Sequence, residues 1–255
     1  DELIGALIGL ARAAENGNPA EKTDELVLKG LFTTITNVNF NNETIKKLKT
    51  EIEKEKGRIS SEHFEDYDMK NIWDAHEDVR SLKSLVLFGI KGMAAYAYHS
   101  LVLGKTDREV TDFFYKALRL IGEDASPEAL LELVMETGKV NFKCMAMLDA
   151  ANTDAYGDPV PTTVPLTIEK GPFIVVSGHD LHDMKLLLEQ TKGKGINIYT
   201  HSEMLPAHGY PKLKEYPHLK GNFGTGWQNQ QSEFHNIPAP ILFTTNCIMP
   251  VRQSY

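Results

Sequence analysis

The chain has 255 residues, of which 42% are hydrophobic and 24% are charged. This composition is typical of a globular protein with a substantial core, and it excludes a disordered chain. The formal net charge of -8 argues against nucleic acid as the main partner, because phosphate binding needs a basic face. The two cysteines, Cys144 and Cys247, are too few for a disulfide framework, so we expect a reducing, cytoplasmic setting.

The first half of the sequence has the apolar spacing of helices. Apolar segments with this spacing cover residues 1–17, 26–37, 41–57, 84–104, 106–124 and 126–153. Asn42 and Thr106 are the expected N-caps of two of them, and Gly57 is an expected helix end. Ser126 followed by Pro127 is a third helix start. We therefore predict an N-terminal helical bundle.

The segment at 84–104 is the most apolar window of the chain. Lys91 and His99 interrupt it, whereas a membrane span needs about 20 uninterrupted apolar residues. We predict a buried core helix here, opened by Asp78 or Ser81, and no membrane contact.

Residues 156–172 contain four prolines and predict a connector, which places domains at 1–158 and 159–255. Beyond the connector, short apolar runs alternate with helical spacing. Strands are predicted at 172–178, 195–200, 219–223 and 238–247, and helices at 180–195 and 226–237. This alternation indicates a Rossmann-like parallel α/β domain, complete or partial, after the helical bundle.

Residues that metals bind follow three of the predicted strands. His179 follows the first strand, His201 and Glu203 follow the second, and Cys247 ends the last. Because ligands bind beyond the carboxyl ends of parallel strands, we expect these side chains to share one edge of the sheet. Imidazole, carboxylate and thiolate together favour a transition metal, with too few thiolates for a cluster held by four cysteines.

Other interpretations remain open for the same residues. Glu203 could cap a helix, as Asp180 could, and Cys247 could be an inert buried thiol. A mononuclear zinc hydrolase would use His179, His201 and Glu203, because two histidines and a glutamate form a common catalytic zinc set. A module without catalytic activity is the remaining alternative.

Several long irregular runs resemble the hybrid cluster protein family, also called prismane proteins or hydroxylamine reductases. These runs are GKVNFKCMAMLDAANTDAYGDPVPT, SGHDLHDMKLLLEQTKGKGINIYTHSEMLPAHGYP, GNFGTGWQNQQSEF and PILFTTNC. The resemblance is strong over residues 138–250, and the first ~140 residues are similar to the family's N-terminal helical domain. The nickel-iron carbon monoxide dehydrogenases share this architecture, but THSEMLPAHGYP is more similar to the hydroxylamine reductases.

The resemblance implies a helical domain followed by two Rossmann-like domains, a 4Fe-4S cluster and a hybrid iron-sulfur-oxygen cluster. His179, Glu203 and Cys247 match the first three hybrid-cluster ligands of the family. His201 matches no ligand, so we expect it to orient Glu203 or a substrate proton, and both are candidates for proton delivery. Cys144 also matches no ligand and is expected in the core.

The resemblance also implies an activity and partners. The family reduces hydroxylamine to ammonia and water, nitric oxide reduction is attributed to it, and the implied electron donor is an NADH-dependent reductase. The family's N-terminal cysteine cluster, its later cysteines and its second glutamate ligand have no counterpart in this sequence. We therefore expect an internal, inactive piece of such an enzyme, with no cluster or an incomplete one.

Overall fold

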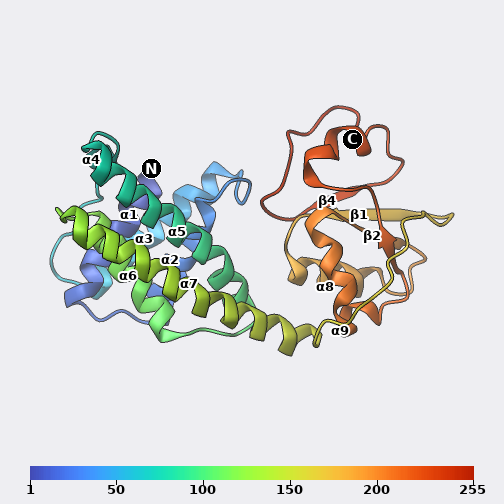
Figure 1. Cartoon of the computed structure of the whole chain (residues 1–255), viewed down its shortest axis with the longest axis horizontal. Helices are drawn as coiled ribbons and strands as arrows, with labels where there is room; N and C mark the ends of the chain where they lie inside the picture. Colours follow the sequence, from blue (N-terminus) through green and yellow to red (C-terminus); the bar gives the residue numbers. More distant parts are fainter. The chain divides into compact units, whose positions relative to one another are not determined.

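The division between two structural units falls within the last helix of the first half. The computed structural model describes residues 1–255, apart from the side chain of Asn16. One unit comprises Asp1–Ala151 and the other Asn152–Tyr255 (Figure 1). The first is helical and the second contains a parallel sheet, which confirms the predicted fold class. The domain boundary predicted at 158/159 lies just beyond the end of that helix and stays a prediction.

The helical unit is built around a helix that is buried on almost all sides. Its helices are α1 (Glu2–Asn16), α2 (Glu21–Thr33), α3 (Asn42–Ile59), α4 (Lys70–Trp73), α5 (Glu77–Val102), α6 (Arg108–Ile121) and α7 (Pro127–Tyr156). Leu7, Ile8 and Leu10 of α1 are fully buried, and α1 packs against α3 and α6. A helix that is apolar all round is stable only inside a core, so α1 organises the bundle.

Two predicted helix caps are wrong by one residue. Asn41, not Asn42, caps α3 by accepting hydrogen bonds from the amides of Glu43 and Thr44. Asp107, not Thr106, caps α6, because a carboxylate accepts from the first amides and also interacts favourably with the helix dipole.

The predicted ends of three helices are also corrected. α3 continues through Gly57 to Ile59, whose burial in the core offsets the roughly 1 kcal/mol that glycine costs inside a helix. α2 begins at Glu21 and ends at Thr33, earlier at both ends than the apolar segment at 26–37. α5 begins at Glu77, one residue before Asp78 and well before Ser81.

Helix α5 is long and apolar enough to cross a membrane by length and composition alone. One face of it lies in the hydrophobic core, where Val86, Leu87 and Ile90 are fully buried. The helix packs against α2 and α6. The prediction of a core helix is therefore confirmed for this face of α5.

The second unit contains a four-stranded parallel sheet in the order β3-β2-β1-β4. Its elements are β1 (Phe173–Ser177), α8 (Leu181–Thr191), β2 (Asn197–His201), the 3₁₀ helix η1 (Ser202–Gly209), α9 (Pro211–Lys214), β3 (Leu219–Asn222), the 3₁₀ helix η2 (Trp227–Asn229), α10 (Gln230–Glu233) and β4 (Ile241–Phe243). Val175, Tyr199 and Phe234 are fully buried at its core. The chain builds outward from β1 to β2 and β3 and then returns to the other side of β1, so the strand order reverses between β1 and β4.

Candidate metal centre

The candidate ligands lie at the edge of the sheet where this reversal occurs. Ser177, the last residue of β1, pairs with His201 of β2 and with Phe243 of β4, so the three strands end level. His179, Glu203 and Cys247 follow these strand ends within four residues. A strand reversal opens a crevice beyond the carboxyl ends of the strands, which is where parallel α/β folds bind ligands.

The backbone turns sharply immediately before each candidate ligand. Residues with positive φ occupy all three of these positions: Gly178 (φ 125°), Ser202 (φ 58°) and Asn246 (φ 73°). Residues other than glycine rarely adopt this conformation, and it concentrates at functional sites where the surrounding structure enforces it. The same backbone feature thus directs three side chains from three different strand ends.

These turns bring the three candidate ligands together. One ligand atom from each of His179, Glu203 and Cys247 lies within 4.8 Å of the others. The Nε2 atom of His179 is 3.2 Å from Sγ of Cys247, and the hydroxyl of Ser202 donates to the carboxylate of Glu203. His179 is exposed and the other two are half-buried, so the cluster is open to solvent. His179, Glu203 and Cys247 lie at one edge of the sheet, as expected for residues that follow parallel strands. Their role as metal ligands stays a prediction.

The surroundings of Cys247 disfavour the thiolate form of its side chain. Burial raises the pKa of Cys247, and the negative charge of Glu203 together with its hydrogen bond raises it further. A metal that binds here must displace the thiol proton, so its affinity should increase with pH. The metal's charge would also relieve the repulsion between thiolate and carboxylate.

His201 lies inside the unit and has its partners there. It is fully buried; its Nδ1 is 2.9 Å from Oγ of Ser177 and its Nε2 is 2.8 Å from the carboxylate of Glu233. The set of His179, His201 and Glu203 that a zinc hydrolase would need is therefore not assembled, because Cys247 occupies the third place. The role predicted for His201 is to orient Glu203 or a substrate proton. The hydrogen bonds of His201 go to Ser177 and Glu233, and the predicted role stays a prediction.

Sequence reasoning missed the polar residues that surround His201. Ser177 and Gln230 are fully buried, and Glu233 is half-buried. Burial alone would raise the pKa of Glu233, but hydrogen bonds from Thr225 and His201 outweigh it and lower the pKa. Gln230 and Glu233 are three residues apart on one short helix, and this spacing is the only sequence signal that they share a face.

The donor set fits a single transition-metal ion or part of a mixed-ligand cluster, because it combines nitrogen, oxygen and sulfur. It does not fit a conventional 4Fe-4S cluster, which needs four cysteines, whereas the sequence has two. The other cysteine, Cys144, is fully buried in the helical core, and burial raises its pKa to about 12. The expectation that Cys144 is a core residue is confirmed.

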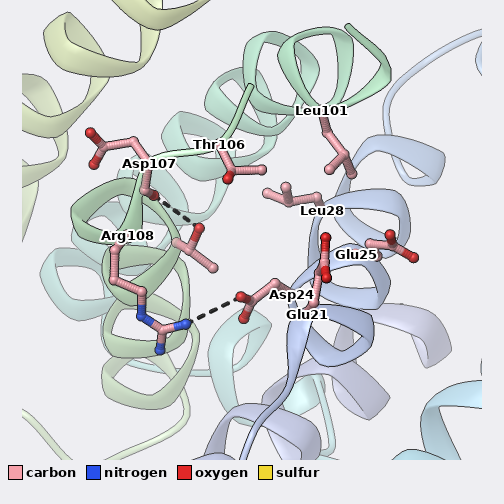
Figure 2. Close-up of a pocket in the computed structure, with 9 residues that line it drawn as sticks. Glu21, Asp24, Glu25, Leu28, Leu101, Thr106, Asp107 and Arg108 are labelled. Atoms are coloured by element: carbon pink, nitrogen blue, oxygen red, sulfur yellow. Dashed lines mark hydrogen bonds and ion pairs between the residues drawn. The ribbon is translucent and has the colours of Figure 1, made fainter. Parts of the chain in front are cut away.

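A second recess lies in the helical unit, between α2 and the start of α6. Its volume is about 100 Å³. Figure 2 shows its lining, which includes acidic residues of α2 together with Asp107 and Arg108. Its polar groups serve the fold: Arg108 pairs with Asp24, Tyr115 donates to Asp24, and Asp107 caps α6. The pocket therefore lacks the converging reactive groups of the sheet edge.

Comparisons with known proteins identify the family of the chain. A family model described as Prismane/CO dehydrogenase matches residues 1–255. The hydroxylamine reductase of Solidesulfovibrio magneticus is 46% identical over 286 aligned residues, which cover 100% of this chain and 53% of the relative. Those of Thermodesulfovibrio yellowstonii and Methanocella arvoryzae are each 42% identical, with the same coverage. The chain thus spans about half the length of the curated relatives it matches, and it belongs to the prismane/CO dehydrogenase family.

Proposed function

We propose that this chain supplies His179, Glu203 and Cys247 as ligands to the iron of a hydroxylamine reductase. The observation that supports this most directly is the convergence of the three ligand atoms within 4.8 Å at the strand reversal. The names of the relatives point the same way, since the three curated relatives described above are hydroxylamine reductases. Under this proposal the remaining ligands come from residues outside this sequence.

The proposed reaction consumes two electrons and two protons for each hydroxylamine. The N–O bond breaks, the nitrogen leaves as ammonia and the oxygen as water, and an NADH-dependent reductase is the proposed source of electrons. A bound iron would supply a Lewis acid and an electron donor at this edge of the sheet. Nitric oxide would be a second substrate of the same centre.

The chain's own residues have distinct proposed roles in this reaction. Glu203 is one of the three clustered residues and accepts a hydrogen bond from Ser202, so we assign its carboxylate to relaying a proton to a small substrate. His179 is exposed and would bind the iron through its imidazole. His201 bonds Ser177 and Glu233, so we assign it to joining the ends of β1 and β2 rather than to direct proton transfer.

Metal titration tests the ligand set without any need for turnover. Co²⁺ is a suitable probe, because a thiolate bound to it gives a charge-transfer absorption band. We expect Co²⁺ to bind the wild-type chain with this band, Cys247→Ser to abolish the band, and His179→Ala to weaken binding roughly tenfold or more. His235→Ala is the matched control, because His235 is an exposed histidine of the same unit. Equal binding by all four proteins would refute the site.

Activity and metal content test the reaction class in a full-length protein that carries this sequence. Glu203→Gln should lower hydroxylamine turnover roughly tenfold or more, because it removes both an anionic ligand and a proton carrier. Wild-type turnover with an unchanged cluster spectrum would remove Glu203 from the mechanism. Zinc at one per chain, without iron or acid-labile sulfide, would overturn the proposed reductase.

A further inference from the structure

The loop that carries Cys247 is held by one buried side chain. Gln230, the first residue of α10, is fully buried. Its Nε2 donates to the carbonyl of Cys247 at 2.8 Å, and its Oε1 accepts from the backbone N–H of Met249 at 2.8 Å. One carboxamide therefore bonds the backbone of the candidate ligand and of the residue two positions later.

The same carboxamide connects this loop to the ends of the neighbouring strands. Nε2 of Gln230 is also 3.1 Å from Oγ of Ser177, the last residue of β1. Ser177 bonds Nδ1 of His201 at the end of β2, and Nε2 of His201 bonds Glu233, which is on the same short helix as Gln230. The polar side chains thus form a closed circuit from α10 through two strand ends and back to α10.

One assignment of hydrogens satisfies the whole circuit. Gln230 donates to the Ser177 oxygen, the Ser177 hydroxyl donates to Nδ1 of His201, and Nε2–H of His201 donates to the carboxylate of Glu233. The carboxylate of Glu233 also accepts hydrogen bonds from the backbone N–H and the hydroxyl of Thr225. A fully satisfied buried network is rigid, because breaking any one bond leaves an unpaired polar group.

We propose that Gln230 is a positioning residue that fixes the thiol of Cys247 relative to His179 and Glu203. The inference rests on the proposed metal site and adds a residue that contacts no ligand atom of that site. Without the carboxamide, the carbonyl of Cys247 and the N–H of Met249 lose their buried partner, and the loop is free to move away from the end of β1. The thiol would then lose its fixed distance to the imidazole of His179.

The test compares two adjacent glutamines of α10. Gln230→Met keeps the volume and removes the bonds, and Gln231→Met is the matched control. Gln231 is only half-buried, and it bonds Pro250 and Arg252, further along the same C-terminal segment. We expect Gln230→Met to weaken Co²⁺ binding by about 10- to 100-fold and to shift or lose the thiolate charge-transfer band. Gln231→Met should leave affinity within about twofold of wild type, because the bonds it removes lie beyond the Cys247 loop.

The outcomes separate this inference from the proposed function. If wild type and Gln230→Met bind Co²⁺ equally with the same thiolate band, the positioning role is overturned while the metal site stands. If the wild-type chain shows no thiolate band, the metal site fails, and amide exchange decides the positioning role. If Gln230→Met fails to fold, hydrogen exchange of the Met249 amide in the wild-type chain also decides the positioning role. Strong protection of that amide supports the positioning role of Gln230, and exchange as fast as that of an exposed amide overturns it.

Discussion

The most stringent prediction concerns Gly178, the residue immediately before His179. A Cβ at this position would overlap Oγ1 of Thr244 and lie 3.0 Å from the backbone nitrogen of Thr245, and the residue has φ of +125°. Thr244 belongs to the segment that leads from β4 to Cys247, and its Oγ1 accepts from the amide of Asp180. Gly178→Ala should therefore push two of the candidate ligands apart.

The magnitude has two parts. The unfavourable φ costs an alanine about 1–3 kcal/mol. The overlap with Thr244 resembles overpacking of a core, which costs about 1–3 kcal/mol. We expect Gly178→Ala to lower the free energy of unfolding of the α/β unit by about 4 kcal/mol, a large fraction of the total of about 5–15 kcal/mol typical of a domain.

Urea unfolding followed by tryptophan fluorescence measures this change. The chain has two tryptophans, Trp73 in the helical unit and Trp227 in the α/β unit, so Trp73→Phe makes the signal specific to the second unit. Gly195→Ala is the matched control, because Gly195 has φ of +70° and a Cβ added there would meet nothing within 4 Å. It should cost only about 1 kcal/mol, the penalty for the backbone conformation alone.

The double variant isolates the overlap. Thr244→Ala removes the atom that the new Cβ meets, so the Gly178→Ala and Thr244→Ala double variant should recover about 1 kcal/mol or more relative to additivity. Co²⁺ affinity should recover in parallel. If Gly178→Ala costs no more than Gly195→Ala, or if the double variant is additive, the close approach of these two segments is not what positions His179.

Three further predictions follow from burial and charge. Burial lowers the pKa of His208, so the unfolded state binds its proton more readily and the free energy of unfolding should fall as pH drops below about 6.5. His208→Gln should flatten this dependence in urea titrations at several pH values, whereas His235→Gln, at an exposed histidine, should not. Phe234→Ala should cost about 3–5 kcal/mol, because this ring is fully buried in the core of the α/β unit; a calorimetric loss below 1 kcal/mol would contradict that packing. Glu203→Gln should speed alkylation of Cys247 at pH 8, because removing the negative charge lowers the thiol pKa and increases the thiolate fraction; a slower reaction would show that the carboxylate does not act on the thiol.

The sequence by itself determined the order of the elements and the identity of the candidate ligands. Short apolar runs separated by helical spacing specify parallel strands, because only crossover connections join them. Once the strands are parallel, their carboxyl ends share one edge, and residues that follow them are forced toward one another. His179, His201, Glu203 and Cys247 could be named for this reason, and the family resemblance then singled out three of them, leaving His201 aside.

Only the tertiary structure decided how those residues are held. The partners in the polar circuit are far apart in sequence, 53 positions in the case of Gln230 and Ser177. Hydrogen bonds between such residues leave no periodic pattern, because they depend on which side chains the packed sheet brings within about 3 Å. The positive φ values before the ligands and the place of His201 inside the unit have the same origin, since the backbone and the rings take these positions only when the surrounding core is formed.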